Sequence, residues 1–359
     1  MPLLIQPLFD GPLDIIGDIH GESEALHALL GALGYDASGD HPEGRRLVFL
    51  GDLGDRGPDS PAVIETVRHL VGRGHAQCVL GNHELNLLRL APKHGNRWFL
   101  DPQHAETHGE FRDCKAAPEE LKSTWREFFS SLPLVLERPD LRVVHAAWHE
   151  ESISALRLHD AETSLEAFKR YEDLTNAQIE QSEFAREAER ERLEHATALV
   201  TETATVPLLS AIARLDELRQ MQNPIRIVTS GLERATEQPF WANGQWRMSD
   251  RVRWWNEYTD PTPVVVGHYW RVFGDDDGRD LGEGERDLFE GCRPNQWLGK
   301  DRNVFCVDFS VGGRYRERTA RGARDDAGGR KFTTRLGAVR WPERQLFFDD
   351  GSPPVSMTR

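Results

Sequence analysis

The stretch that decides the fold is GDLGDRG, residues 51–57, which follows the apolar run Arg46–Leu50. Two similar stretches stand on either side of it. GDIHG at 17–21 follows an apolar run at 13–16, and GNHE at 81–84 follows one at 78–80. Each places polar side chains where a short apolar segment runs into a turn bounded by glycine. In an α/β sheet, ligand sites form at that end of the strands, so we expect the three stretches to meet there.

Two isolated histidines extend this pattern along the chain. His145 follows the apolar pair Val143–Val144, and His268 follows Val264–Val266 and Gly267. Either histidine alone would be read as a hydrogen-bonded core residue. Their positions at the ends of apolar runs, after the three glycine-bounded stretches, instead predict that both contribute to the same site.

The segments between the early motifs have helical spacing. Leucines recur every three or four residues after Ser23, and apolar residues recur in the same way from Ser60 to Leu70. Alternating strands and helices favour parallel strands with helices outside. We therefore predict an α/β domain over residues 1–149 and 223–359. Its second half is expected to form a second sheet packed on the first, from strands at Ile225–Ser230, Pro263–Gly267, Val304–Phe309, Leu336–Trp341 and near Gln345–Phe348.

Residues 150–222 interrupt this domain and show no strand pattern. The segment Glu183–His195 is typical of a charged helix, and Val206–Leu218 of a more apolar one. A solvated helical arm is the simplest interpretation. Its place between two histidine-bearing strands also favours a cap over the site, or a surface that docks a partner.

Composition narrows the class of protein. A net charge of −15 argues against a nucleic-acid-binding protein, and the chain has no patch suited to an anionic membrane. The four cysteines show no CxxC spacing, so we expect buried or free thiols. The first residues lack the basic segment of a signal peptide, and no apolar run is long enough to span a membrane. We therefore expect a cytoplasmic protein.

The polar residues of the motifs form a mixed set of oxygen and nitrogen ligands. Such a set suits Mn, Fe, Zn or similar divalent ions. It has too many ligands for one tetrahedral ion, so two ions sharing a carboxylate are expected. We expect Asp52 to be the shared ligand, Asp18 and His20 to serve one ion, and Asn82, His145 and His268 to serve the other.

A second group of residues suits proton transfer and phosphate binding. His83 adjoins Asn82 and is free to donate a proton to a leaving alkoxide. Asp55 is placed to orient that imidazole, and Arg56 to bind a phosphoryl group through its guanidinium. No Ser or Cys has the surroundings of a nucleophile. We therefore expect hydrolysis by a metal-bound hydroxide.

Together, GDIHG, GDLGDRG, GNHE, His145 and GHYW at 267–270 resemble the phosphoprotein phosphatase family of the calcineurin-like metallophosphoesterases. That family includes bacterial diadenosine tetraphosphate hydrolases. The resemblance implies a β-sandwich flanked by helices and a dinuclear centre of Mn, Fe or Zn, with Mn favoured. The implied ligands are Asp18, His20, Asp52, Asn82, His145 and His268. It further implies that His83 and Asp55 act as the acid and that Arg56 and Asn82 contact the phosphate. It does not cover 150–221.

The sequence departs from the family in the region around His268. A second phosphate-binding arginine is expected there, and Arg247, Arg251, Arg253 and Arg271 are candidates, of which we favour Arg251. Five tryptophans of this region are expected in the core or the wall of the site, and exposed ones would suit base stacking. They are Trp241, Trp246, Trp254, Trp255 and Trp270. The acidic stretch 275–285 follows closely and is either a solvated loop or a rim of the site.

Three functions remain open from the sequence. The first is a phosphomonoesterase of the serine/threonine protein phosphatase type, acting on phosphorylated proteins. The second is a dinucleoside polyphosphate hydrolase, which would use the same metal ligands on a nucleotide. The third is a signalling or scaffold protein whose helical insertion binds a partner while the metal site is vestigial. The complete set of ligands speaks against the third.

Overall fold

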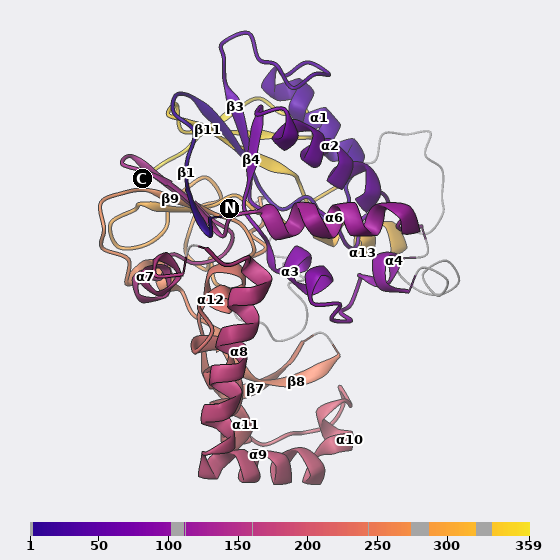
Figure 1. Ribbon diagram of the computed structural model, residues 1–359, viewed down its shortest axis with the longest axis vertical. Coiled ribbons are helices and arrows are strands. Elements are labelled where there is room, and N and C mark those ends of the chain that lie inside the picture. The colour runs from indigo at the N-terminus through magenta and orange to yellow at the C-terminus, as the bar shows by residue number, and fades with distance from the viewer. Residues whose placement is uncertain are drawn as a thin grey trace.

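The computed structural model of the chain describes residues 3–101, 111, 113–159, 161–242, 244–273, 287–320 and 332–359. The acidic stretch at 275–285 lies outside these residues. Two sheets stack on each other, helices cover their outer faces, and a long arm projects away from them, downward in Figure 1. This architecture confirms the predicted α/β sandwich flanked by helices.

The first sheet contains the strands that precede the early motifs. Its order is β13-β12-β11-β2-β3-β4, and β2, β3 and β4 run parallel, as predicted. The bounds are β2 Leu13–Ile16, β3 Arg46–Phe49, β4 Ala76–Cys78, β11 Gly337–Trp341, β12 Gln345–Phe348 and β13 Val355–Ser356. The prediction that β11 and β12 belong to the second sheet is wrong. The edge of β2 opposite β3 pairs with β11 instead, antiparallel, with Ile15 opposite Val339.

The second sheet has the order β1-β5-β6-β9-β10. Its strands are β1 Ile5–Pro7, β5 Val135–Arg138, β6 Leu141–Val144, β9 Val264–Val266 and β10 Val304–Cys306. Strands β6 and β9 pair in parallel, with Val143 opposite Val265, so the residues that follow both strands emerge at the same edge. Strands β1 and β5 were not predicted, because each is short and lies beside proline.

Alternation along the strands explains the layers. Leu13 and Ile15 of β2 share a buried cluster with Val143 and Val265 of the second sheet, so they fill the space between the sheets. Ile16 belongs instead to the cluster that includes the helices. A strand buried on both faces reads as a continuous apolar run, which is why these segments are so apolar.

Helices cover the outer faces of the sandwich. The bounds are α1 Ser23–Leu33, α2 Ser60–Gly72, α3 Asn82–Leu88, α4 Arg97–Leu100, α6 Glu119–Ser131, α7 Glu150–Arg157 and α13 Arg314–Ala320. Short 3-10 turns lie at Trp254–Asn256 and Val311–Gly313. None of the helices in the described residues is both long enough and apolar enough to cross a membrane. The four cysteines are unpaired, as predicted.

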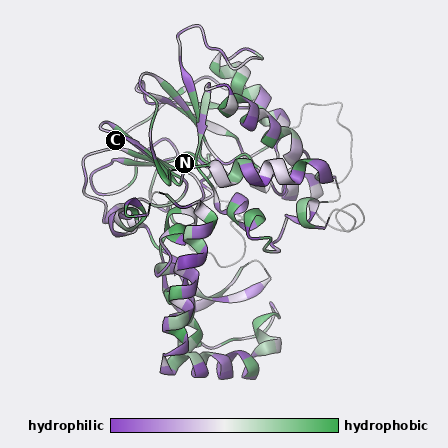
Figure 2. Cartoon of the chain, in the orientation of Figure 1, coloured by the Kyte–Doolittle hydropathy of each residue, from purple (hydrophilic) through white to green (hydrophobic). Residues whose placement is uncertain are grey.

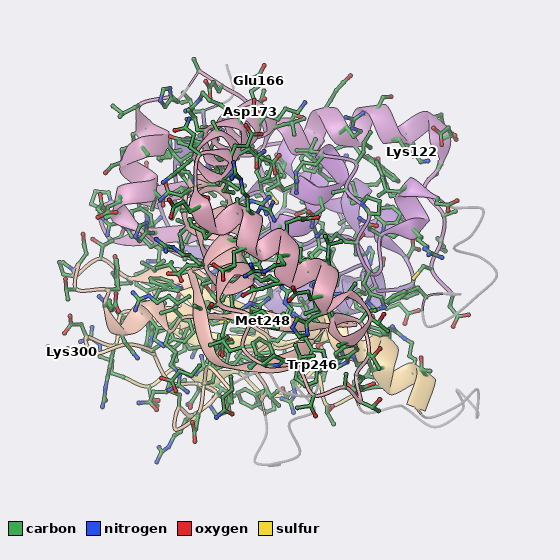
Figure 3. All side chains as sticks on the ribbon, turned by 90° about the horizontal axis from the view of Figure 1, so that it is seen from below. Lys122, Glu166, Asp173, Trp246, Met248 and Lys300 are labelled. Atoms are coloured by element: carbon green, nitrogen blue, oxygen red, sulfur yellow. The ribbon has the colours of Figure 1, made fainter. Side chains whose placement is uncertain are left out.

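The arm consists of four helices and a hairpin. The helices are α8 Ser164–Glu180, α9 Glu183–Glu194, α10 Ala196–Leu199 and α11 Ser210–Met221, and the strands are β7 Glu233–Ala242 and β8 Gln245–Arg251. The arm has its own small core, in which Ile212 and Leu215 of α11 share a cluster with Met248 of β8. Figure 2 shows that α9 is largely hydrophilic. Figure 3, a view along the arm, places Glu166 and Asp173 at the outer edge, far from Trp246 and Met248.

One predicted strand is a helix. Residues Pro224–Ser230 form α12, not a strand. Pro224 occupies the first turn, the Asn223 side chain accepts a hydrogen bond from the backbone N–H of Ile225, and Gly231 ends the helix. The helix is buried on most sides, so its apolar residues show no helical period. Asparagine followed by proline was the available signal for a helix start.

Candidate functional site

The predicted site residues converge where strands of both sheets end. Asp18 and His20 follow β2, Asp52 follows β3, His145 follows β6 and His268 follows β9, while Asn82 begins α3. The backbone there adopts the left-handed region that residues with side chains rarely enter, with φ of 47° at His20, 49° at Asp52 and 71° at His268. Such strained conformations persist where the surroundings enforce them, commonly at functional sites.

Glycines allow the polar side chains to approach the backbone closely. A Cβ atom on Gly267 would lie 2.0 Å from Asp18 Oδ1, and one on Gly81 would lie 2.3 Å from Asp52 Oδ1. Both distances are far below a normal contact. The glycines of these motifs therefore create the space that the two carboxylates occupy.

One set of potential ligand atoms surrounds Asp52, Asn82, His145 and His268. The Oδ1 atom of Asn82 lies 3.2 Å from His145 Nε2 and 2.9 Å from His268 Nδ1. Asp52 Oδ2 lies 3.5 Å from His145 Nε2. Asp52, His145 and His268 have ligand atoms within 4.8 Å of one another, so they could hold one ion.

A second set lies on the other side of Asp52. Its Oδ2 atom lies 3.7 Å from His20 Nε2 and 3.8 Å from His83 Nε2, and these three residues also have ligand atoms within 4.8 Å of one another. Asp52 therefore takes part in both sets. This is the arrangement expected of a carboxylate shared between two ions.

Asp18 and His268 carry buried polar atoms that find no partner. Asp18 Oδ2 accepts a hydrogen bond from the backbone N–H of His268 at 3.0 Å, whereas Asp18 Oδ1 and His268 Nε2 have no hydrogen-bond partner among the described residues. Burial, followed by the charges of Asp308 and Asp52, raises the pKa of Asp18 well above its usual value. Unpaired buried carboxylates are costly, and divalent cations would satisfy them. The residues therefore fit a divalent-metal centre.

Two of the imidazoles are oriented through the ring nitrogen that points away from the site. His20 Nδ1 lies 3.1 Å from the carbonyl oxygen of Gly54, and His145 Nδ1 lies 2.5 Å from that of Leu50. Donation from these nitrogens leaves both Nε2 atoms free to coordinate a metal. Burial opposes the charged form of His145, but the neighbouring carboxylates of Asp52 and Asp18 raise its pKa to about 10.

His83 is fixed beside this centre by a carboxylate. Its Nδ1 atom lies 2.5 Å from Asp55 Oδ2, and Trp98 Nε1 donates a hydrogen bond to Asp55 Oδ1 at 2.6 Å. Arg56 Nη1 lies 3.1 Å from His20 Nε2, and Arg56 Nη2 lies 3.2 Å from His83 Nε2. The guanidinium therefore faces the same space as both imidazoles, where a phosphoryl group could be bound.

Of the four candidates for a second phosphate-binding arginine, Arg251 is the one whose charge influences a site residue, His268. Burial and then the charge of Arg251 lower the pKa of His268 well below its usual value. Arg271 is buried and donates to the carbonyl oxygens of Cys306 and Gln296, and Arg253 donates to that of Asp287. Arg247 also lies on β8, four residues before Arg251.

Two of the five tryptophans are buried in the core, and the other three are half-buried. Trp254 and Trp255 are buried in the core, whereas Trp241 and Trp246 are half-buried on the arm hairpin. Trp270 is half-buried, and its ring lies 4.8 Å from Cζ of Arg56. It is therefore the member of this group that reaches the metal centre.

Three buried residues support the site without having been predicted to do so. The Glu84 carboxylate accepts backbone hydrogen bonds from Asp52 and Leu53, which fixes the strained turn. Asp308 accepts one from Trp270, and Trp98 orients Asp55. Glu84 stands within GNHE and could have been suspected. Asp308 follows an apolar strand, as the ligand residues do, but Trp98 lies in an irregular stretch that carried no signal.

Comparison with known proteins agrees with this geometry. Residues 11–186 match the model of the family described as calcineurin-like phosphoesterase. The chain is 35% identical over 173 residues to an asymmetrical bis(5'-nucleosyl)-tetraphosphatase PrpE of Halalkalibacterium halodurans, covering 45% of this chain and 65% of that protein. It is 39% identical over 145 residues to the protein of the same name from Anoxybacillus flavithermus, covering 37% and 56%. The matched part is thus less than two thirds of the length of either relative.

Solved structures resemble the chain over most of its length, at low identity. One, assigned provisionally as a diadenosine tetraphosphatase, has a TM-score of 0.41 at 20% identity and covers 97% of both chains. Another, a cold-active protein-tyrosine phosphatase of a Shewanella species, has a TM-score of 0.49 at 16% identity and covers 100% of this chain and 83% of that one. The family model and the motifs that build the site agree that residues 11–186 of this chain are similar to the calcineurin-like phosphoesterase family.

Proposed function

We propose that this protein is a metal-dependent hydrolase that cleaves a phosphoanhydride bond of dinucleoside polyphosphates. The observation that carries the proposal is the similarity to bis(5'-nucleosyl)-tetraphosphatases over 173 residues of this chain. Sequence alone placed phosphomonoester hydrolysis of the serine/threonine phosphatase type first. The named relatives favour the nucleotide substrate instead.

We assign the metal ligands as two groups that share Asp52. Asp18, His20 and Asp52 would hold one ion, and Asp52, Asn82, His145 and His268 the other, with Mn as the favoured metal. Bound ions of this kind stabilise negative charge on phosphoryl oxygens and lower the pKa of water. Asp18 is preferred to His83 as a ligand because its Oδ1 atom is buried without a partner, whereas His83 is held by Asp55.

The remaining residues would bind the phosphoryl group and move a proton. Arg56 faces the space beside His20 and His83, so it would bind phosphoryl oxygens through its guanidinium. Arg251 would do so from the side of His268, and Asn82 from beside His145 and His268. His83, oriented by Asp55, would donate a proton from Nε2 to the leaving oxygen. Trp270 is placed to contact the part of the substrate that leaves the metal centre.

The test is a comparison of kcat/KM for diadenosine tetraphosphate and for a phosphoserine peptide, with Mn²⁺ present. We expect at least a hundredfold preference for the nucleotide, and the preference should survive replacement of Mn²⁺ by Zn²⁺ or Fe²⁺. An equally large preference for the peptide would overturn the proposal and restore the phosphoprotein as substrate. The Asp52→Asn variant serves as the control for contaminating phosphatases.

The same assay decides whether the centre is vestigial. Bound metal without turnover of either substrate, or of p-nitrophenyl phosphate, would contradict an enzymatic role. A partner protein bound by the arm would then become the leading interpretation.

A further inference from the structure

Positively charged side chains gather where the arm joins the sandwich. They come from the loop that follows α3, from α11 and α12 and from β8, which lie near this junction, and from α9, which lies farther out on the arm and packs on α11 (Figure 1). The residues are Arg89, Lys93, Arg192, Arg219, Arg226 and Arg247. We call this group the junction cluster.

Few carboxylates offset these charges. Glu172 Oε1 lies 3.3 Å from Arg89 Nη2 and 3.0 Å from Arg226 Nη2, so one carboxylate serves two guanidinium groups. Asp216 lies 3.5 Å from Arg192. Within the described residues, no hydrogen bond or ion pair involves the Lys93 ammonium or the Arg247 guanidinium. The cations therefore exceed the carboxylates that pair with them, in a chain whose net charge is −15.

Burial and then mutual repulsion lower the pKa of two members of the cluster. The surrounding protein, and then the charges of Arg89, Arg226 and Arg247, lower the pKa of Lys93. Burial and the charge of Arg226 likewise lower the pKa of Arg89. Glu172 opposes the effect on Arg89 but does not cancel it. Repulsion of this kind disfavours the charged forms, and an anion bound among the cations would relieve it.

A cavity opens beside the cluster and is lined by polar groups. Its volume is about 270 Å³, and its walls are formed by Glu172, Thr175, Asn176, Arg219, Asn223 and Arg226. Arg226 and Arg89 also lie over the ring of Phe168, at 5.0 and 4.2 Å from its centroid. This aromatic support holds the two guanidinium groups in place, so part of the ordering cost of a bound anion is already met.

The cluster is continuous with the metal centre along two routes. Helix α3 begins with Asn82 and His83 at the centre and ends just before Arg89, a distance of about 10 Å along the helix axis. Arg247 and Arg251 lie on β8, about 13 Å apart along the strand. Cations therefore extend from the centre to the arm, over a distance that one phosphate group does not span.

Lys93 lies on the loop that links the metal centre to the junction cluster. It lies two residues before Gly95, whose carbonyl oxygen accepts a hydrogen bond from the backbone N–H of Arg56 at 3.5 Å. Its ammonium responds to the charges of Arg89, Arg226 and Arg247. The loop after α3 thus carries one member of the junction cluster, Lys93, and also contacts the backbone of Arg56.

We propose that the junction cluster is a second anion site, which binds the phosphates of an oligophosphate chain at a distance from the metal centre. The chain has two possible sources with the same chemistry. It is either the part of a polyphosphate substrate that lies beyond the scissile bond or a free inorganic oligophosphate. The first source rests on the proposed function, whereas binding of the anion does not.

The first test is equilibrium binding of tripolyphosphate to the full chain in EDTA, measured by calorimetry. We expect the variant Lys93→Gln/Arg226→Gln/Arg247→Gln to bind at least tenfold more weakly than the unaltered chain. A matched control, Arg186→Gln/Arg190→Gln/Arg234→Gln, removes the same charge from exposed arginines of the arm outside the cluster and should change the Kd less than twofold. Circular dichroism checks that both variants fold. Equal weakening in both, or no binding by the unaltered chain, would overturn the proposal.

The second test distinguishes the two sources by steady-state kinetics with Mn²⁺. If the substrate chain occupies the cluster, the first variant should raise KM for diadenosine tetraphosphate at least tenfold and leave kcat/KM for p-nitrophenyl phosphate within twofold. If KM is unchanged while tripolyphosphate binding is lost, the occupant is a free oligophosphate. A chain that binds tripolyphosphate through the cluster but does not cleave the nucleotide would contradict the proposed function and retain the second anion site.

Discussion

The sandwich and the arm place their charged residues in opposite ways. Around the metal centre, Asp18, Asp52 and His145 are at most 2% exposed, and the backbone of Asp52 lies in the left-handed region. The arm has an apolar core of small extent, and its charged residues lie at the surface or in the polar cavity at the junction. Buried charged side chains hold reacting atoms in fixed positions, and each needs a hydrogen-bond or ionic partner in its surroundings. Surface charges attract a flexible anion and tolerate imprecise placement.

The largest expected effect tests whether the centre depends on its shared carboxylate. Asp52→Asn removes the charge common to both ligand sets, so metal affinity and turnover should fall together. Loss of a residue that only orients a ligand costs 10- to about 100-fold, and loss of Asp52 should exceed this for every substrate. Activity is measured against p-nitrophenyl phosphate with saturating Mn²⁺, and folding by circular dichroism. Near-normal turnover would remove Asp52 from its central role.

The next prediction concerns the space that glycine provides. Gly267→Ala would place a methyl group 2.0 Å from Asp18 Oδ1, so either the carboxylate or the β9 turn must move. We expect a stability loss of about 1–3 kcal/mol from overpacking, together with weaker Mn²⁺ binding in a competition titration. Gly31→Ala in α1 is the matched control, because nothing lies within 4 Å of its added carbon. A Gly267→Ala protein that binds metal normally would show that the close approach is dispensable.

A smaller and more selective effect is expected at His83. Phenyl phosphate has a poor leaving group, phenoxide. His83→Ala should lower kcat/KM for this substrate by about 100-fold. The loss on p-nitrophenyl phosphate should be less than about tenfold, because that leaving group needs little protonation. Asp55→Asn should follow the same pattern, since it orients the imidazole. Equal losses on both substrates would indicate that His83 is a metal ligand. Its ring could take that role, because His20, Asp52 and His83 have ligand atoms within 4.8 Å of one another.

The smallest effect on activity should come from the core of the arm. Ile212→Ala deletes a side chain that is 5% exposed, and such changes cost about 2–5 kcal/mol. We expect faster hydrogen exchange in α9 and α11, with kcat for p-nitrophenyl phosphate within twofold of the unaltered value. Loss of p-nitrophenyl phosphate turnover would mean that the sandwich depends on the arm for its own chemistry, which would break the contrast between the two regions.

Most of the sandwich was predictable because its strands are buried and end in glycine-bounded turns. Strands β2, β3 and β9 appear in the sequence as apolar runs, and the polar residues that follow them had to share an edge. Within 150–221, the charged run at 183–195 and the more apolar run at 206–218 predicted two helices, and α9 and α11 overlap these runs.

What could not be predicted depends on contacts between distant segments. The pairing of β11 with β2 joins residues more than 320 positions apart, and nothing local distinguishes this from a second sheet. Helix α12 is buried on most sides, so it lacked a helical period. The hairpin β7–β8 carries charged and polar residues on both faces, and only its packing on α11 makes it a sheet. The junction cluster combines residues from several such elements and had no signature in the linear sequence.

The distance along the chain between segments that meet in the folded protein has a consequence for biosynthesis. Asp18 meets the backbone of His268, 250 residues later, and β2 lies beside β11, which is made later still. During translation, the early motifs emerge long before the segments that complete their surroundings. The centre can therefore assemble only after His268 has been synthesised, and folding dominated by such distant contacts is slow. A nascent chain that ends before His268 would carry an incomplete set of ligands and should be inert toward phosphorylated metabolites in the cell.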